Sequence, residues 1–190
     1  MSSYQILKTQ IYLCIVNLRG LILPLIILFF FISTCFQSAN SQELLGRFHD
    51  WNLFRSKRNN QNICYIASTP IKREGNYLKR GEPYFLITEV KNDVDEVSSS
   101  SGFIFKDSSN IELSFGGKKF NLFPFKTIAW AQDKNEDIEI IKEMQKNADM
   151  IVTSIANDGK IAIDTYSLIG FVESYKKLKQ ICDLTINDQI

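Results

Sequence analysis

The sequence predicts a mainly β domain, an antiparallel sandwich or barrel-like sheet, with two helices that place it at the border of the α+β class. Two observations support this. Short runs rich in Ile, Val, Thr, Tyr and Phe recur over residues 51–166, and these residue types favour strands. Only two segments have helical periodicity, one after Asp133 and one at the C-terminal end.

Eight runs are predicted to be strands, over residues 51–54, 63–67, 84–90, 97–105, 111–115, 118–123, 151–155 and 161–166. Two of the joins between them are sharp. Gly116 and Gly117 predict a two-residue hairpin, because glycine supplies the positive φ that primed turns require. Asn157-Asp158-Gly159 predicts a turn between the last two strands.

Two helices interrupt this pattern. Asp133 and Glu136 form a capping-box pattern, which predicts a helix that runs to about Lys146. Its expected apolar stripe is Ile138, Ile141, Met144 and Ala148. Ser167 is expected to cap the second helix, whose inner face follows Leu168, Phe171, Tyr175, Leu178 and Cys182.

Residues 1–41 are predicted to direct export and to be separate from a single domain formed by residues 42–190. An apolar run, Gly20–Phe36, follows a stretch without acidic residues, and small residues suit cleavage after Ser41. An uncleaved single-pass anchor, in which Gly20–Phe36 tethers the domain to a membrane, is the alternative. Lipidation at Cys35 is a third. The basic residues near the N-terminus would in each case place the domain outside the cytoplasm, in the periplasm or cell envelope.

The charge of the expected domain is balanced. Residues 42–190 carry 20 basic and 21 acidic side chains. This gives no electrostatic case for a nucleic-acid or anionic-membrane partner. About 150 residues are enough for one domain with a sizeable core.

Two cysteines remain beyond residue 41, Cys64 and Cys182, which lie 118 positions apart. Two lone cysteines in an oxidising compartment usually pair, so a disulfide between an early strand and the last helix is expected. Two free thiols or a metal site are the competing interpretations. Two cysteines and the single distant His49 offer too few ligands for structural zinc, and no metal or cofactor is predicted.

No catalytic constellation is visible in the sequence. His49 and Asp50 would point to opposite faces of a strand, so His49 is interpreted as a surface residue of the first strand. Asp164, with Glu173 or Asp158, is the carboxylate on which an enzymatic interpretation would depend, but nothing in the sequence sets their separation.

Two further sets of residues have a structural and a functional interpretation. Lys72, Arg73, Lys79 and Arg80 are interpreted as a solvated basic connection in preference to a polyanion site. Trp51 and Trp130 are interpreted as core residues in preference to ligand-stacking rings.

An ordered set of motifs covers residues 48–182. It begins with Phe48-His49-Asp50-Trp51 and continues with Cys64-Tyr65-Ile66-Ala67-Ser68-Thr69-Pro70 and Arg80-Gly81-Glu82-Pro83-Tyr84. Then come Glu96-Val97-Ser98, Ser101-Gly102-Phe103, Phe120-Asn121-Leu122-Phe123 and Ala129-Trp130, and last Asp164-Thr165-Tyr166-Ser167-Leu168-Ile169-Gly170-Phe171 with Cys182. In this order they resemble the bacterial invasion-associated locus B family of exported proteins.

The resemblance implies a β-rich envelope domain of a family to which no catalytic mechanism is assigned. It implies scaffold roles for Asp50, Trp51, Trp130, Asp164, Ser167, Leu168, Gly170 and Phe171. Relatives often carry an Arg-Gly pair at the last hairpin, where this chain has Asn157-Asp158-Gly159. We therefore expect a non-enzymatic envelope protein that binds another protein or a cell-surface component. The alternative is a periplasmic hydrolase or accessory enzyme that uses carboxylates such as Asp164.

Overall fold

The computed structural model describes residues 42–58, 61–91 and 93–184. The expected export segment, the possible tether Gly20–Phe36 and the last six residues lie outside the described part. Within that part, no helix combines the length and the apolar character needed to span a membrane.

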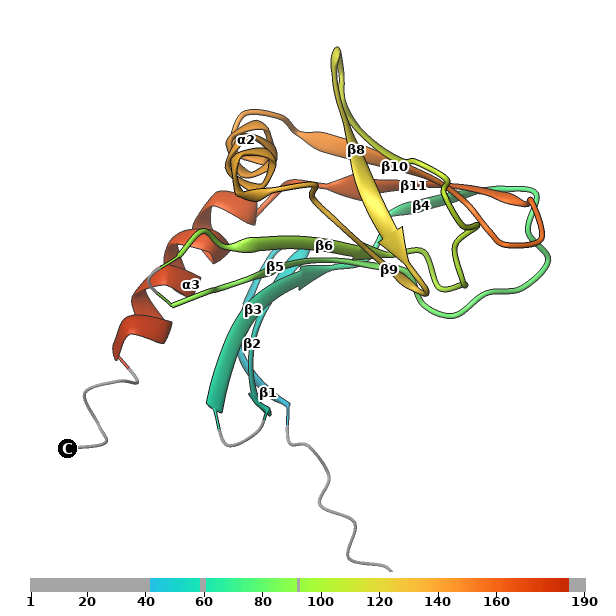
Figure 1. Cartoon of the computed structure of the whole chain (residues 1–190). Helices are drawn as coiled ribbons and strands as arrows, with labels where there is room; N and C mark the ends of the chain where they lie inside the picture. Colours follow the sequence, from blue (N-terminus) through green and yellow to red (C-terminus); the bar gives the residue numbers. More distant parts are fainter. Residues whose placement is uncertain (1–41, 59–60, 92, 185–190) are drawn as a thin grey trace, which may run out of the picture. The chain divides into compact units, whose positions relative to one another are not determined.

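The described strands form one open, antiparallel sheet of eleven members, which confirms the predicted mainly β class (Figure 1). Along the chain they are β1 (Glu43–Phe48), β2 (Trp51–Arg58), β3 (Gln61–Ser68), β4 (Lys72–Gly75), β5 (Tyr84–Thr88), β6 (Glu96–Ser100), β7 (Ile111–Phe115), β8 (Lys118–Phe125), β9 (Ile128–Trp130), β10 (Asp149–Ile155) and β11 (Ile161–Ser167). Their order across the sheet is β1-β2-β3-β5-β6-β9-β8-β7-β10-β11-β4. The sheet therefore ends at β1 and at β4 and does not close into a barrel.

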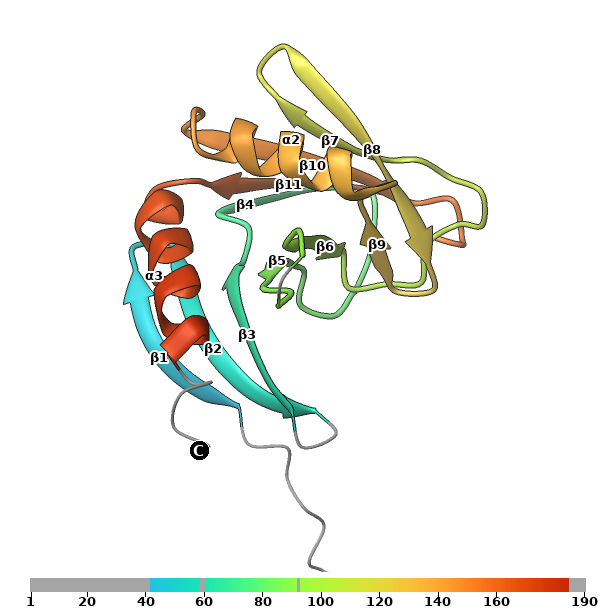
Figure 2. The same ribbon diagram turned by 60° about the vertical axis from the view of Figure 1, so that its left-hand side comes forward.

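The two helices are α2 (Lys134–Met144) and α3 (Phe171–Leu184). Helix α3 packs along β1, β2 and β3, as Figure 2 shows, and α2 packs against β6. Between the bent sheet and the helices lies one apolar core. The largest fully buried side chains include Trp51, Phe85, Tyr166 and Phe171. Trp51 meets Phe171 edge-on, with 5.0 Å between the ring centroids.

Both predicted hairpins are confirmed. Gly116 has a φ of +57° in the turn between β7 and β8. Gly159 has a φ of +84° and donates its backbone N–H to the carbonyl of Ala156 in the turn between β10 and β11.

Three strands, β1, β4 and β9, were not expected from the sequence, and two expected strands are shorter. The strand predicted over 84–90 ends at Thr88. The strand predicted over 97–105 ends at Ser100, and Phe105 forms only an isolated bridge with Ala156. His49 is exposed as expected, but it lies in the turn between β1 and β2, with a φ of +51°. Asp50 shares this turn, and its carbonyl accepts a hydrogen bond of 2.7 Å from the Ser68 hydroxyl.

The N-terminus of α2 is as predicted. The Asp133 side chain accepts hydrogen bonds from the backbone N–H groups of Asn135 and Glu136, and Glu136 accepts one from Gln132. The predicted apolar stripe is partly wrong. Its buried residues are Ile140, Ile141 and Met144, whereas Ile138 is partly exposed and Ala148 lies beyond the helix.

The prediction that Ser167 caps the last helix is wrong. Ser167 ends β11, and its hydroxyl accepts the backbone N–H of Ile169 in the turn that precedes α3. Leu168 is buried in this turn, and Phe171 is the first residue of α3. Gly170 has a φ of +87°, and a Cβ there would overlap the carbonyl oxygen of Phe48. The absence of a side chain at Gly170 therefore lets the turn before α3 pack closely against the β1–β2 turn.

Cys64 is fully buried in β3, and β3 is in contact with α3, the helix that contains Cys182. The side chain of Cys182 lies outside the described part of the chain. The Cys64–Cys182 disulfide stays a prediction.

Candidate binding groove

Asp164, the carboxylate on which an enzymatic interpretation would depend, is fully buried in β11 beside Arg80. Both of its oxygens accept hydrogen bonds from the guanidinium, and the Arg80 Nη1–Asp164 Oδ2 distance is 2.6 Å. Arg80 also donates to the carbonyl of Ser101 at 2.9 Å and lies over the ring of Tyr77. The Arg80 side chain is only 4% exposed, so its interpretation as part of a solvated connection is wrong.

This environment gives Asp164 a structural role. A general base must reach the proton that it removes, and both Asp164 oxygens are already engaged by a buried cation. Glu173 is exposed in the first turn of α3, and Asp158 is exposed and pairs with Lys160 in the β10–β11 turn. The structure therefore does not gather the predicted carboxylates into one buried site.

Two further residues of the basic connection are also paired. Lys72 forms an ion pair with Glu74, and Arg73 forms one with Glu82 at 2.6 Å. Lys72 and Arg73 belong to β4, the edge strand that pairs with β11. Three of the four basic residues of this segment are therefore already paired with carboxylates.

The two tryptophans have different positions. Trp51 is completely buried, in agreement with its interpretation as a core residue. Trp130 is only partly buried, and the expectation that it fills the core is wrong. It lies at the end of β9, on the wall of a surface groove of about 370 Å³. The residues that line this groove come from β6, β8, β9 and the start of α2, and they are Glu96, Phe123, Phe125, Trp130, Ala131 and Asp137.

Strand alternation explains why aromatic side chains face solvent here. Leu122 in β8 is buried, so the next residue, Phe123, points to the opposite face. Phe123 is 48% exposed and Phe125 is 58% exposed. Phe123 lies opposite Trp130 in the β8–β9 ladder, and their ring centroids are 6.1 Å apart. The ladder thus places three aromatic rings on one exposed surface.

Two carboxylates border the rings. Glu96 accepts a hydrogen bond of 3.2 Å from the indole Nε1–H of Trp130. Asp137, in the first turn of α2, accepts one of 2.8 Å from the backbone N–H of Val97. Burial raises the pKa of Asp137 to about 6, and the negative charges of Glu96, Glu136 and Asp133 add to this effect. The groove is therefore aromatic and acidic.

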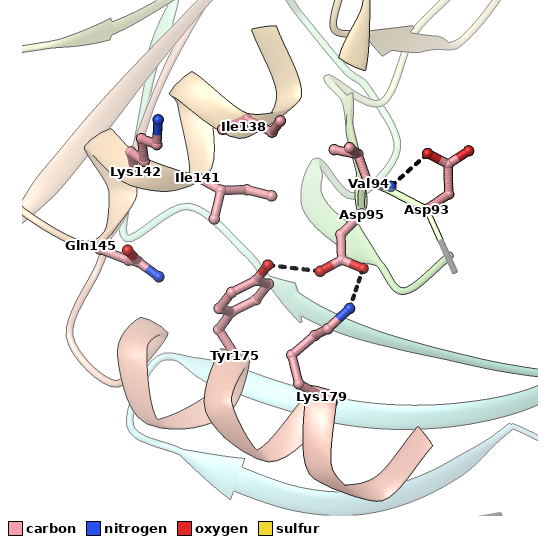
Figure 3. Close-up of a pocket in the computed structure, with 9 residues that line it drawn as sticks. All are labelled: Asp93, Val94, Asp95, Ile138, Ile141, Lys142, Gln145, Tyr175 and Lys179. Carbon is pink, nitrogen blue, oxygen red and sulfur yellow. Dashed lines mark hydrogen bonds and ion pairs between the residues drawn. The ribbon is translucent and has the colours of Figure 1, made fainter. Parts of the chain in front are cut away.

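A second hollow, of about 300 Å³, lies between α2 and α3 (Figure 3). At its centre, Asp95 accepts hydrogen bonds from the Tyr175 hydroxyl at 2.7 Å and from the Lys179 ammonium at 2.8 Å. Burial and the bond to Asp95 raise the pKa of Tyr175, so its hydroxyl remains a donor. These bonds join α3 to the connection between β5 and β6. Because Lys179 neutralises Asp95, the carboxylate is not available as an unpaired charge for a ligand.

Sequence reasoning missed both Asp95 and the exposed phenylalanines. The signal for the groove was Leu122-Phe123, because two adjacent apolar residues of one strand cannot both face the core of a single sheet. Asp95 had no comparable signal in its polar connection. Within the described residues, no group of three or more His, Cys, Asp or Glu side chains is placed to hold a metal ion.

Comparison with known proteins shows a likeness in fold. No protein-family model and no curated protein sequence matches the chain. The crystal structure of invasion associated protein B from Bartonella henselae is similar in fold, with a TM-score of 0.54 and 13% sequence identity. The match covers 74% of this chain and 98% of that chain. At this identity the likeness concerns the fold, and it agrees with the fold that the resemblance of the motifs implies.

Proposed function

We propose that this chain is an exported, non-enzymatic envelope protein whose β-rich domain binds another protein through the groove between β8, β9 and α2. The observation that carries the proposal is the exposure of Phe123 and Phe125 beside the partly buried Trp130. The fold likeness to invasion associated protein B supports it.

Exposed aromatic rings that lie together are a known property of interaction surfaces. A folded chain gains nothing by leaving them in water, because their burial is favourable by about 25 cal/mol per Å² of apolar surface. Aromatic anchors that fill a pocket also supply much of the energy of protein interfaces. Phe123 and Phe125 therefore suit a partner that covers them.

Two expectations from the sequence belong to this proposal. Residues 1–41 would send the domain to the periplasm or cell envelope, with cleavage after Ser41 or with an anchor that stays in the membrane. Cys64 and Cys182 would then pair and close the domain in that oxidising compartment.

Photocrosslinking in the native envelope tests the proposal. p-Benzoylphenylalanine placed at Phe125 should give a discrete adduct, whereas the same probe at Val172, an exposed position on α3, should not give that adduct. The adduct from position 125 should disappear when Phe123→Ala and Trp130→Ala are combined in the same chain. Equal thermal midpoints of the variants would show that the fold is intact. Identical adducts from both positions, or an adduct that survives the double substitution, would contradict the proposed groove.

A further inference from the structure

We infer, on the basis of the proposed function, that the groove selects a protein segment that presents an arginine or lysine side chain next to an apolar residue. The groove is defined by Glu96, Phe123, Phe125, Trp130, Ala131 and Asp137.

The first argument is the balance of charge around the rings. Within the described part of the chain, neither Glu96 nor Asp137 takes part in an ion pair with a lysine or arginine, and each is bonded to a neutral donor. Asp133 and Glu136 add negative charge from the same end of α2. Carboxylates further along this helix do form ion pairs, since Glu139 and Glu143 both pair with Lys118. Even with the ammonium of Lys126 near Phe125, the four carboxylates beside the groove leave a net negative charge, whereas Glu139 and Glu143 are paired with Lys118.

The second argument is the cost of covering the groove. A neutral apolar segment that sealed Phe123 and Trp130 would also remove water from Glu96 and Asp137. Burial of a carboxylate without a compensating charge is costly, so such a segment is disfavoured. An anionic segment would add repulsion to this cost. A cationic side chain avoids the desolvation cost and the repulsion, because its attraction to the carboxylates compensates for the water that they lose.

The third argument is that the same cation matches the rings. Guanidinium and ammonium groups bind the faces of Trp, Tyr and Phe, and arginine can also pair bidentately with a carboxylate. A cation of the chain already lies near these rings, because the ammonium of Lys126 is 5.3 Å from the centroid of the Phe125 ring. A volume of about 370 Å³ is near the lower end of the usual range for ligand pockets, which suits one or two side chains.

Three tripeptide probes test the inference against the exported protein. They are acetyl-Leu-Arg-Leu-amide, its neutral isostere acetyl-Leu-citrulline-Leu-amide, and acetyl-Leu-Glu-Leu-amide. Binding is followed by chemical-shift changes of backbone amides in β8 and β9, and by the fluorescence of Trp130. We expect the arginine probe to bind at least tenfold more tightly than the citrulline probe, and the glutamate probe to bind most weakly.

The variants Glu96→Gln and Asp137→Asn should reduce the preference for arginine over citrulline to less than about threefold when they are combined. Both substitutions keep an acceptor for the present hydrogen bonds, so the fold should survive. Glu173→Gln is the matched control, because Glu173 is also an acidic residue in the first turn of a helix, and it should leave all affinities unchanged.

The failures of the two proposals are distinguishable. Equal affinity for the arginine and citrulline probes, or no binding of any probe, overturns the inference about charge. The photocrosslink from position 125 is independent of these probes, and its loss in the Phe123→Ala and Trp130→Ala chain decides whether the groove binds a protein at all.

Discussion

The indole Nε1–H of Trp51 donates a hydrogen bond of 3.0 Å to the backbone carbonyl of Ser167, which lies 116 positions later in the chain. The same ring contacts Phe171, so one side chain joins β2 to the end of β11 and to the start of α3. Trp51→Phe keeps an aromatic ring but leaves the Ser167 carbonyl without this donor. We expect a loss of about 1–3 kcal/mol in the free energy of unfolding, measured by urea denaturation. Trp130→Phe, at a partly exposed position, should cost less than about 1 kcal/mol.

Arg80 and Asp164 should be coupled strongly in stability. Arg80→Met leaves the buried Asp164 carboxylate without its cation and should cost about 3–5 kcal/mol. The double variant Arg80→Met with Asp164→Leu removes both charges and should recover much of this loss, because apolar replacement of a whole buried pair is often neutral. Arg73→Met breaks the exposed pair with Glu82 and should cost less than about 1 kcal/mol. Equal costs for Arg80→Met and Arg73→Met would contradict the assigned burial.

Asp137 should make stability depend on pH. Its pKa is raised from 3.8 to about 6, so the folded protein holds this proton more tightly than the unfolded chain. The charged form therefore carries a penalty that is complete above pH 6 and disappears as the pH falls towards 4. Asp137→Asn should stabilise the protein by about 1–2 kcal/mol at pH 7.5, where partial exposure of the group limits the gain. Thermal unfolding at pH 7.5 and at pH 4 checks this, and a gain of the same size at both pH values would contradict it.

Gly170 should not tolerate a side chain. Gly170→Ala places a Cβ against the carbonyl of Phe48 and forces an L-residue to a φ of +87°. We expect a loss of at least about 2 kcal/mol in the free energy of unfolding. Gly117→Ala is the control, since a Cβ at Gly117 would meet nothing within 4 Å, and it should change stability by less than about 1 kcal/mol.

The cysteines give a chemical test. In the unreduced exported protein, Cys64 and Cys182 should not react with a thiol reagent, even in denaturant, until the protein is reduced. Reduction should lower the free energy of unfolding by about 2–5 kcal/mol, as is typical of a disulfide that closes a long loop. The double variant Cys64→Ala with Cys182→Ala should be indifferent to reductant. Labelling of Cys64 and Cys182 themselves in the unreduced protein would contradict the pairing.

Local signals predicted the parts of the fold that depend on local chemistry. Gly116 and Gly159 supply the positive φ of their turns, and Asp133 caps α2 with its own side chain. Strand β4 had no such signal, because its four residues are polar and exposed. It is a strand only because β11 offers backbone groups to pair with it, and that partner lies about 90 positions away in the sequence.

The candidate groove could not be predicted from the sequence for a related reason. Trp130 and Phe123 are apolar, and their burial depends on which face of the sheet the helices cover. Composition does not contain that information. In the same way, the sequence around Arg80 does not indicate its burial, because its partner Asp164 is 84 positions distant.

The pairing of β4 with β11 also has a consequence for the timing of folding. Residues 72–75 leave the ribosome long before residues 161–167, yet β4 has its place in the sheet only beside β11. The Trp51–Ser167 and Arg80–Asp164 contacts close similarly long loops, and such non-local contacts form late. A nascent chain of this protein therefore cannot complete its core before its last quarter has been made. If the chain is exported, as we propose, this delay keeps the polypeptide open while it is threaded through the membrane.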